Sequence, residues 1–207
     1  MLYVLIVAMY SFLCHGQMSS IEKATIGNRS RLLIDIRTND GIKKYIANCG
    51  FKKVTMLADS TKIRLLGELL SFTSDTAMCY KPIGNYANLT IARKVPVSEE
   101  YSLKIDAIIL INYVAFASNA FVYSPYPVLY DEETGKETCC NGTALDSVVD
   151  LYKNWYKSIQ KNGFTDYSFP LLGQRYEWFG CFGCKSKKSL FKQYPHWNDY
   201  YNCKELE

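Results

Sequence analysis

The pattern of apolar and polar positions is clearest in the C-terminal half of the chain, where it has a helical period. Between residues 144 and 161 the apolar side chains recur every three or four positions, so they share one face of a helix. This stripe consists of Leu145, Val148, Val149, Tyr152, Trp155, Tyr156 and Ile159. Thr143 is a suitable N-cap, and Asn162 and Gly163 are a suitable C-terminal stop. The pattern therefore predicts an amphipathic helix over residues 144–161.

The region before this helix has the pattern of β-strands. Short apolar stretches are separated by turn signals such as Thr38-Asn39-Asp40-Gly41, which is typical of strand spacing. The predicted strands are residues 32–37, 51–57, 63–72, 87–94, 101–113 and 114–123. Residues 63–72 also fit a helix, because their leucines lie at helical spacing. We expect a hairpin tip at residues 131–136 and a further hairpin or irregular strands at residues 167–182.

These elements predict a fold that is mainly β with one amphipathic helix in its C-terminal half (α+β). The expected architecture is an antiparallel sandwich or a lipocalin-like barrel, because both place a β-rich region before such a helix. The Gly-x-Trp signature of lipocalins is absent: Gly27 is followed by Asn28 and Arg29, and every tryptophan lies beyond residue 150. We therefore assign no family. Without internal repeats or linkers, residues 17–207 are expected to form a single disulfide-stabilised domain.

The N-terminal segment predicts export. Residues 1–16 contain no charged side chain, and residues 2–13 form an almost unbroken apolar run of the length found in secretory signal peptides. A second uncharged segment, residues 107–130, is long enough to cross a bilayer. Asn112 interrupts it, Pro125 breaks its end, and residue types that favour strands dominate its interior. We expect buried strands there and no membrane span.

Cysteines and glycosylation sequons support the same compartment. Cys14 lies in the predicted signal peptide, which leaves Cys49, Cys79, Cys139, Cys140, Cys181, Cys184 and Cys203. Seven is an odd number, so up to three disulfides are expected beside one thiol that is free, buried or paired with another molecule. The sequons begin at Asn28, Asn88 and Asn141, which places these segments at the surface of a secreted, extracellular glycoprotein.

Composition argues against several classes of function. A net charge of +4 is too small for a clustered nucleic-acid-binding field. Outside the predicted signal peptide the only histidine is His196, whereas most hydrolytic sites need a histidine base or several histidine ligands. No nucleotide-binding or hydrolase motif occurs. We predict no catalytic residue, no cofactor and no metal, with a secreted enzyme that uses carboxylates or the Cys181/Cys184 pair as the alternative.

The C-terminal cysteines have three interpretations. Cys181 and Cys184 at this spacing form a redox couple in some proteins, and with His196 and Cys203 they make an allowed zinc set. In an oxidising compartment, structural disulfides are favoured.

The aromatic tail is the candidate recognition patch. Aromatic and hydrogen-bonding groups gather at Tyr194, His196, Trp197, Tyr200 and Tyr201, and such groups anchor interfaces. The alternative is a tail that packs on the core through the same rings. The leading hypothesis is a secreted glycoprotein that binds a host protein or a small amphiphile non-covalently, for example as a host-directed immune modulator.

Overall fold

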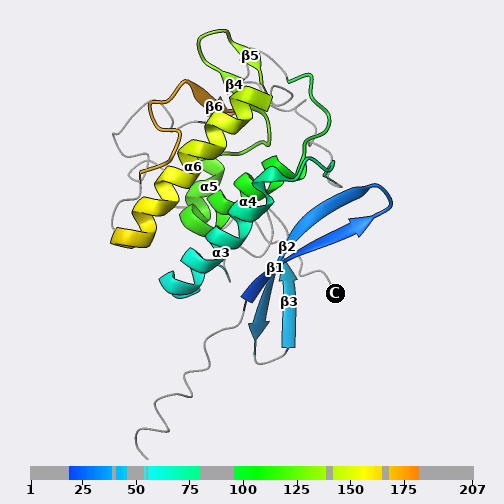
Figure 1. Cartoon of the computed structure of the whole chain (residues 1–207), viewed down its shortest axis with the longest axis vertical. Helices are drawn as coiled ribbons and strands as arrows, with labels where there is room; N and C mark the ends of the chain where they lie inside the picture. Colours follow the sequence, from blue (N-terminus) through cyan, green and yellow to red (C-terminus); the bar gives the residue numbers. More distant parts are fainter. Residues whose placement is uncertain are drawn as a thin grey trace, which may run out of the picture.

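The computed structural model describes residues 19–38, 41–45, 54, 56–79, 96–138, 142–164 and 168–181. Figure 1 shows an α+β arrangement in which helices α3, α4 and α6 dominate one part and two small sheets flank them. The helices are α3 (Asp59–Ser71), α4 (Leu103–Phe116), α5 (Ala120–Tyr123) and α6 (Gly142–Asn162), with short 3-10 turns η1 (Phe72–Ser74) and η2 (Ala117–Asn119). The strands are β1 (Ser19–Ile26), β2 (Arg29–Thr38), β3 (Gly41–Tyr45), β4 (Leu129–Asp131), β5 (Lys136–Glu137) and β6 (Tyr176–Trp178).

Helix α4 is the centre of the core. Every one of its residues except Lys104 is buried, and Lys104 reaches out to Asp146 of α6, with 2.7 Å between Nζ and Oδ1. The prediction of strands at residues 101–113 and 114–123 is therefore wrong. A helix that is buried on all sides is apolar at almost every position, so its sequence shows no helical period. Tertiary packing has overridden the strand preference of its isoleucines and valines.

The remaining helices agree better with the sequence pattern. Residues 63–72 fall largely within α3, so the helical interpretation is right and the strand interpretation is wrong; Leu65, Leu66 and Leu69 face the core. The predicted helix over residues 144–161 is confirmed as α6. Gly163 ends it with a φ of +69° and donates its N–H to the Ile159 carbonyl at 2.8 Å, as a C-terminal glycine does. Thr143 lies inside the first turn of α6 and is not the residue before it.

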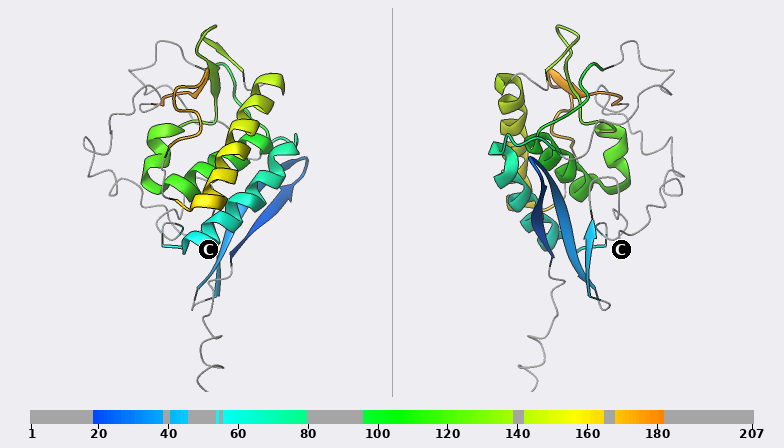
Figure 2. Two further views of the ribbon diagram at one scale, coloured as in Figure 1. Left: turned by 60° about the vertical axis from the view of Figure 1, so that its left-hand side comes forward. Right: turned by 90° about the vertical axis from the view of Figure 1, so that its right-hand side faces the viewer.

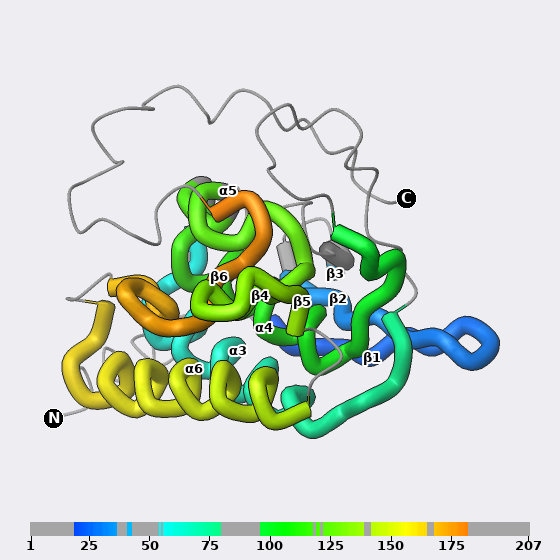
Figure 3. Tube along the Cα trace, turned by 90° about the horizontal axis from the view of Figure 1, so that it is seen from above, coloured from blue at the N-terminus to red at the C-terminus, as the bar shows by residue number. Residues whose placement is uncertain are grey.

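The sheets are small and antiparallel, with strand orders β1-β2-β3 and β5-β4-β6. The mainly β prediction with one helix is wrong, and so is the sandwich or barrel, because the described residues contain three major helices and no closed barrel. Figure 2 shows the first sheet beside α3 and α4. In Figure 3 its β1–β2 hairpin extends beyond the helices. Strand β2 packs against α4, and its buried side chains Leu32, Ile34 and Ile36 belong to the core.

Several shorter predictions are also settled. The predicted strand at residues 32–37 is confirmed within β2. Thr38 and Gly41, the ends of the predicted turn, pair across β2 and β3, and residues 39–40 lie outside the described residues. The hairpin tip at residues 131–136 joins β4 and β5. Of residues 167–182, one short strand, β6, pairs with β4. The strand predicted at residues 87–94 lies outside the described residues. Of the strand predicted at residues 51–57, only Val54, Met56 and Leu57 are described, and none of them is in a strand, so the prediction is wrong for these residues.

The outer edge of β1 is covered by side chains of α3. Ile21 donates its backbone N–H to Glu68 Oε2 at 3.0 Å. Arg64 donates to the carbonyl and the hydroxyl of Ser19, at 2.5 and 3.1 Å. Edge strands expose unpaired backbone groups that attract other chains. Here an arginine and a glutamate from the neighbouring helix take the place of another strand.

None of the described helices is both long and apolar enough to span a membrane. Helix α4, the most apolar of them, has 14 residues, a length of about 21 Å against the roughly 30 Å of a bilayer core. The prediction that residues 107–130 do not form a membrane span is confirmed for the described chain.

Candidate functional site

A pocket of about 290 Å³ lies at the C-terminal end of α6. Figure 3 shows this end of α6, in yellow, beside the orange segment that follows it in the chain. Helix α6 contributes residues from its buried stripe and from the margin of that stripe, and residues 168–174 close the other side. The lining residues are Trp155, Ser158, Ile159, Asn162, Gly163, Ser168, Phe169, Pro170, Leu172 and Gln174.

Stacked aromatic rings form the wall of this pocket. Phe169 stacks on Tyr123 with ring centroids 4.5 Å apart, and it meets Phe116 edge to face at 5.6 Å. The Trp155 ring lies 5.5 Å from Phe116. Aromatic pairs at these separations are attractive beyond the area that they bury. The two aromatic lining residues, Trp155 and Phe169, thus pack against the rings of Phe116 in α4 and Tyr123 in α5.

The polar groups of the pocket are neutral. The described lining includes two hydroxyls, from Ser158 and Ser168, and two amides, from Asn162 and Gln174, but no Asp, Glu, Lys, Arg, His or Cys. The indole Nε1 of Trp155 is buried and has no hydrogen-bond partner among the described residues. An apolar wall with a few hydrogen-bonding groups suits non-covalent binding of a small molecule. These lining residues supply no titratable group for general acid–base catalysis.

A buried hydrogen-bond network lies next to the aromatic wall. Tyr152 Oη donates to Asn112 Oδ1 at 2.8 Å, and Asn112 Nδ2 donates to Ser124 Oγ at 2.9 Å. Trp178 Nε1 donates to Tyr152 Oη at 3.3 Å. The network therefore joins α4, α6, β6 and the end of α5. Burial raises the pKa of Tyr152, so the phenol stays neutral. Its ring also contacts Trp155, with 6.3 Å between centroids, which links the network to the pocket.

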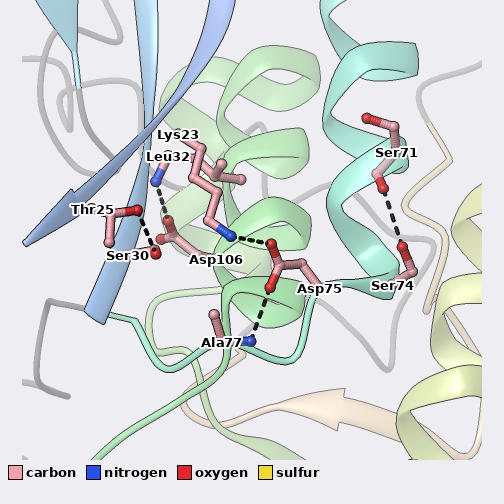
Figure 4. Close-up of polar contacts among 9 residues, drawn as sticks. All are labelled: Lys23, Thr25, Ser30, Leu32, Ser71, Ser74, Asp75, Ala77 and Asp106. Atoms are coloured by element: carbon pink, nitrogen blue, oxygen red, sulfur yellow. Dashed lines mark hydrogen bonds and ion pairs between the residues drawn. The ribbon is translucent and has the colours of Figure 1, made fainter. Parts of the chain in front are cut away.

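Figure 4 shows how carboxylates tie the first sheet to the helices. Asp106 of α4 accepts the backbone N–H of Leu32 at 3.1 Å. Asp75 lies 2.5 Å from Lys23 Nζ and accepts the backbone N–H of Ala77 at 2.9 Å. The hydrogen bond from Lys23 is the main reason why the pKa of Asp75 is lowered. Both carboxylates thus have structural partners.

The second sheet contains two more engaged carboxylates. Asp131 accepts Arg175 Nε at 3.1 Å and Nη2 at 2.6 Å, a bidentate geometry. This hydrogen bonding from Arg175 lowers the pKa of Asp131 to about 2. Burial raises the pKa of Glu137, but hydrogen bonds from Ser98 and from the Val97 backbone outweigh it and leave the pKa lowered. These two carboxylates therefore hold loops and strands of the second sheet together.

Exchange of Asp131 for asparagine is expected to make the free energy of unfolding fall less steeply as the pH is lowered. Because the pKa of Asp131 is about 2 when folded and about 3.8 as an ordinary carboxyl, its contribution is present above about pH 4 and is lost as the pH falls toward about 2. Urea unfolding midpoints at several pH values in this window would measure the difference between wild type and D131N. E132Q, at an exposed neighbour, is the control. If the stability of D131N fell with pH as steeply as that of wild type, the lowered pKa of Asp131 would be contradicted.

Two of the seven candidate cysteines are among the described residues. Cys79 is buried and keeps its thiol, which shares a hydrogen bond with the Tyr101 phenol. Cys181 is disulfide-bonded, and no disulfide joins two of the described cysteines. The other five, Cys49, Cys139, Cys140, Cys184 and Cys203, lie outside the described residues. Cys79 is therefore our candidate for the odd thiol.

The remaining candidate residues are placed only in part. Asn28 is exposed in the turn between β1 and β2, whereas Asn88 and Asn141 lie outside the described residues. Three residues of the zinc alternative also lie outside the described residues: Cys184, His196 and Cys203. The recognition patch also lies there: Tyr194, His196, Trp197, Tyr200 and Tyr201. Among the residues with described positions, no three His, Cys, Asp or Glu side chains are grouped to hold a metal.

The sequence predicted the helix that lines one side of the pocket but not the pocket itself. Trp155 and Ile159 belong to the predicted helical stripe, but the segment that closes the pocket was treated only as a hairpin or irregular strands. The available signal was the pair of chain breakers, Pro170 and Gly173, within an aromatic-rich stretch directly after the helix. Comparisons with protein-family models, with curated proteins and with solved structures find no match to this chain.

Proposed function

We propose that this chain is a secreted glycoprotein that binds a small amphiphile non-covalently in the pocket at the end of α6. The pocket carries the proposal, because it combines an aromatic wall with hydroxyl and amide groups, as small-molecule sites do. Export is supported by the apolar run at residues 2–13, the sequons and the number of cysteines. Exposure of Asn28 in a hairpin turn supports glycosylation at that sequon.

The volume of the pocket limits the size of the ligand. A water molecule occupies about 30 Å³ in the liquid, so a pocket of about 290 Å³ holds roughly ten groups of that size. This is just below the range for drug-sized ligands, which begins at about 300 Å³. An aliphatic or aromatic body with one polar group fits these dimensions. We therefore favour a small amphiphile over a protein ligand at this site.

Filling the pocket from the helix side tests the proposal. The probe is 1-octanol, and binding is measured by calorimetry and by tryptophan fluorescence, since Trp155 is in the wall. Ser158 is an exposed lining residue of α6, and phenylalanine there is expected to weaken binding by at least about tenfold by occupying the space. The matched control is N154F, at an exposed position of the same helix that does not line the pocket.

The two variants separate occupancy of the pocket from a general effect on the helix. Wild type and N154F should bind 1-octanol equally, and unfolding midpoints should show that both variants are folded. Equal binding by wild type and S158F would place the bound alcohol elsewhere. No binding by the wild type would contradict the proposal directly.

A further inference from the structure

We infer that the pocket selects an uncharged ligand whose head group both donates and accepts hydrogen bonds. This inference rests on the proposed function and names the class of ligand. It follows from three properties of the site: the neutrality of the lining, its position at the end of α6, and the kinds of polar group that it offers.

Neutrality of the lining disfavours ligands of either charge. The four polar side chains among the described lining residues are two hydroxyls and two amides. A charged head group that gives up part of its hydration here finds no partner of opposite sign in the lining to offset the loss. A cation finds no carboxylate in this lining, and an anion finds no arginine or lysine. Lys161 lies in the last turn of α6, but it is exposed and does not line the pocket.

The position at the end of α6 adds a penalty for anions. Ile159, Asn162 and Gly163 line the pocket, and they belong to the last turn and the stop of a 21-residue helix. The C-terminal end of a helix carries a partial negative charge, since its last carbonyls point outward. A carboxylate or phosphate held there would be repelled. A hydroxyl or amide proton would be attracted.

The polar side chains match a head group of dual character. Asn162 and Gln174 each offer a carbonyl oxygen and an NH₂ group, and serine hydroxyls donate or accept. An alcohol or a primary amide on an apolar body meets these requirements.

Three probes with the same eight-carbon chain test the selectivity: 1-octanol, octanoate and octylammonium, titrated at neutral pH into the full-length processed protein. Their apolar parts are identical, so differences in affinity report on the head group. We expect 1-octanol to bind at least about tenfold more tightly than either ion.

A charge introduced at the rim should reverse the preference. Gln174 lines the pocket and is exposed at the surface, so Q174E adds a carboxylate without a change of shape. We expect the affinity of Q174E for octylammonium to rise by about fivefold or more and that for octanoate to fall. The control is N154D, which adds the same charge to α6 away from the lining and should leave the order of the three probes unchanged.

The outcomes separate this inference from the proposed function. If none of the three probes binds, the proposed function fails, and the inference fails with it. If octanoate or octylammonium binds as tightly as 1-octanol, the pocket still binds amphiphiles but the selectivity for uncharged ligands is overturned. If N154D changes the affinities as much as Q174E does, the charge acts from a distance and the local argument is overturned.

Discussion

Replacement of Tyr152 by phenylalanine is expected to lower the free energy of unfolding by about 2–4 kcal/mol. The substitution removes one hydroxyl and leaves two buried groups without their partner: Asn112 Oδ1, which accepts from it, and Trp178 Nε1, which donates to it. Tyr152, Asn112 and Trp178 are all fully buried, so water does not replace the lost bonds. Each buried polar group left unsatisfied costs about 1–3 kcal/mol.

The same substitution one turn later on α6 is the control. Tyr156 is only partly buried, and its hydroxyl accepts a hydrogen bond from exposed Gln160 at 3.1 Å. Y156F should therefore cost less than about 1 kcal/mol. Urea unfolding under non-reducing conditions, followed by circular dichroism, gives both values. Equal losses in the two variants would show that the network contributes little to stability.

Exchange of Gly67 for alanine is expected to destabilise the fold by up to about 2 kcal/mol, although alanine favours helices. A methyl group at this position of α3 would lie 2.5 Å from the Tyr156 hydroxyl oxygen and 3.2 Å from the ring carbon that bears it. Overpacking of this kind costs about 1–3 kcal/mol, and the gain in helix propensity offsets about 1 kcal/mol of it. The missing side chain of Gly67 thus lets α3 and α6 approach closely.

A double-mutant cycle isolates this contact. Because Y156F removes the atom that the new methyl group meets first, G67A should cost less in the Y156F background than in wild type, with a coupling of about 1 kcal/mol. The four unfolding free energies are measured under the same conditions. Strict additivity of the two substitutions would contradict the proposed collision.

The helices differ in how well their sequences predicted them, and the reason is their exposure. Helix α6 has one buried face and one solvated face, so its stripe was visible and its bounds were predicted within two residues. Helix α4 has no solvated face, and its run of isoleucine, valine and aromatic residues was interpreted as strands. Helix α3 is intermediate in exposure, and its four leucines fitted the period of a helix as well as that of a strand. The fold class was wrong chiefly because of α4.

The candidate site was less predictable than the helix that bears it. The pocket exists because residues 168–174 fold back against the end of α6, and such a meeting depends on tertiary packing that no local pattern encodes. Asn112 was considered only as an interruption of an apolar segment. In the structure it is the centre of a buried network. A lone amide inside an apolar run can thus indicate a buried partner elsewhere in the chain.

The anchoring of β1 by α3 limits where the proposed signal peptide can be removed. Ser19 supplies both its carbonyl and its hydroxyl to Arg64, and Ile21 is held by Glu68. A peptidase that cut after Ser19 would deprive Arg64 of both its acceptors on Ser19 and leave Ile36 of β2 without its partner on β1. The mature protein should therefore begin no later than Ser19, close to the expected cleavage near residue 16. Strand β1 would then keep all of its contacts with Arg64 and Glu68 of α3.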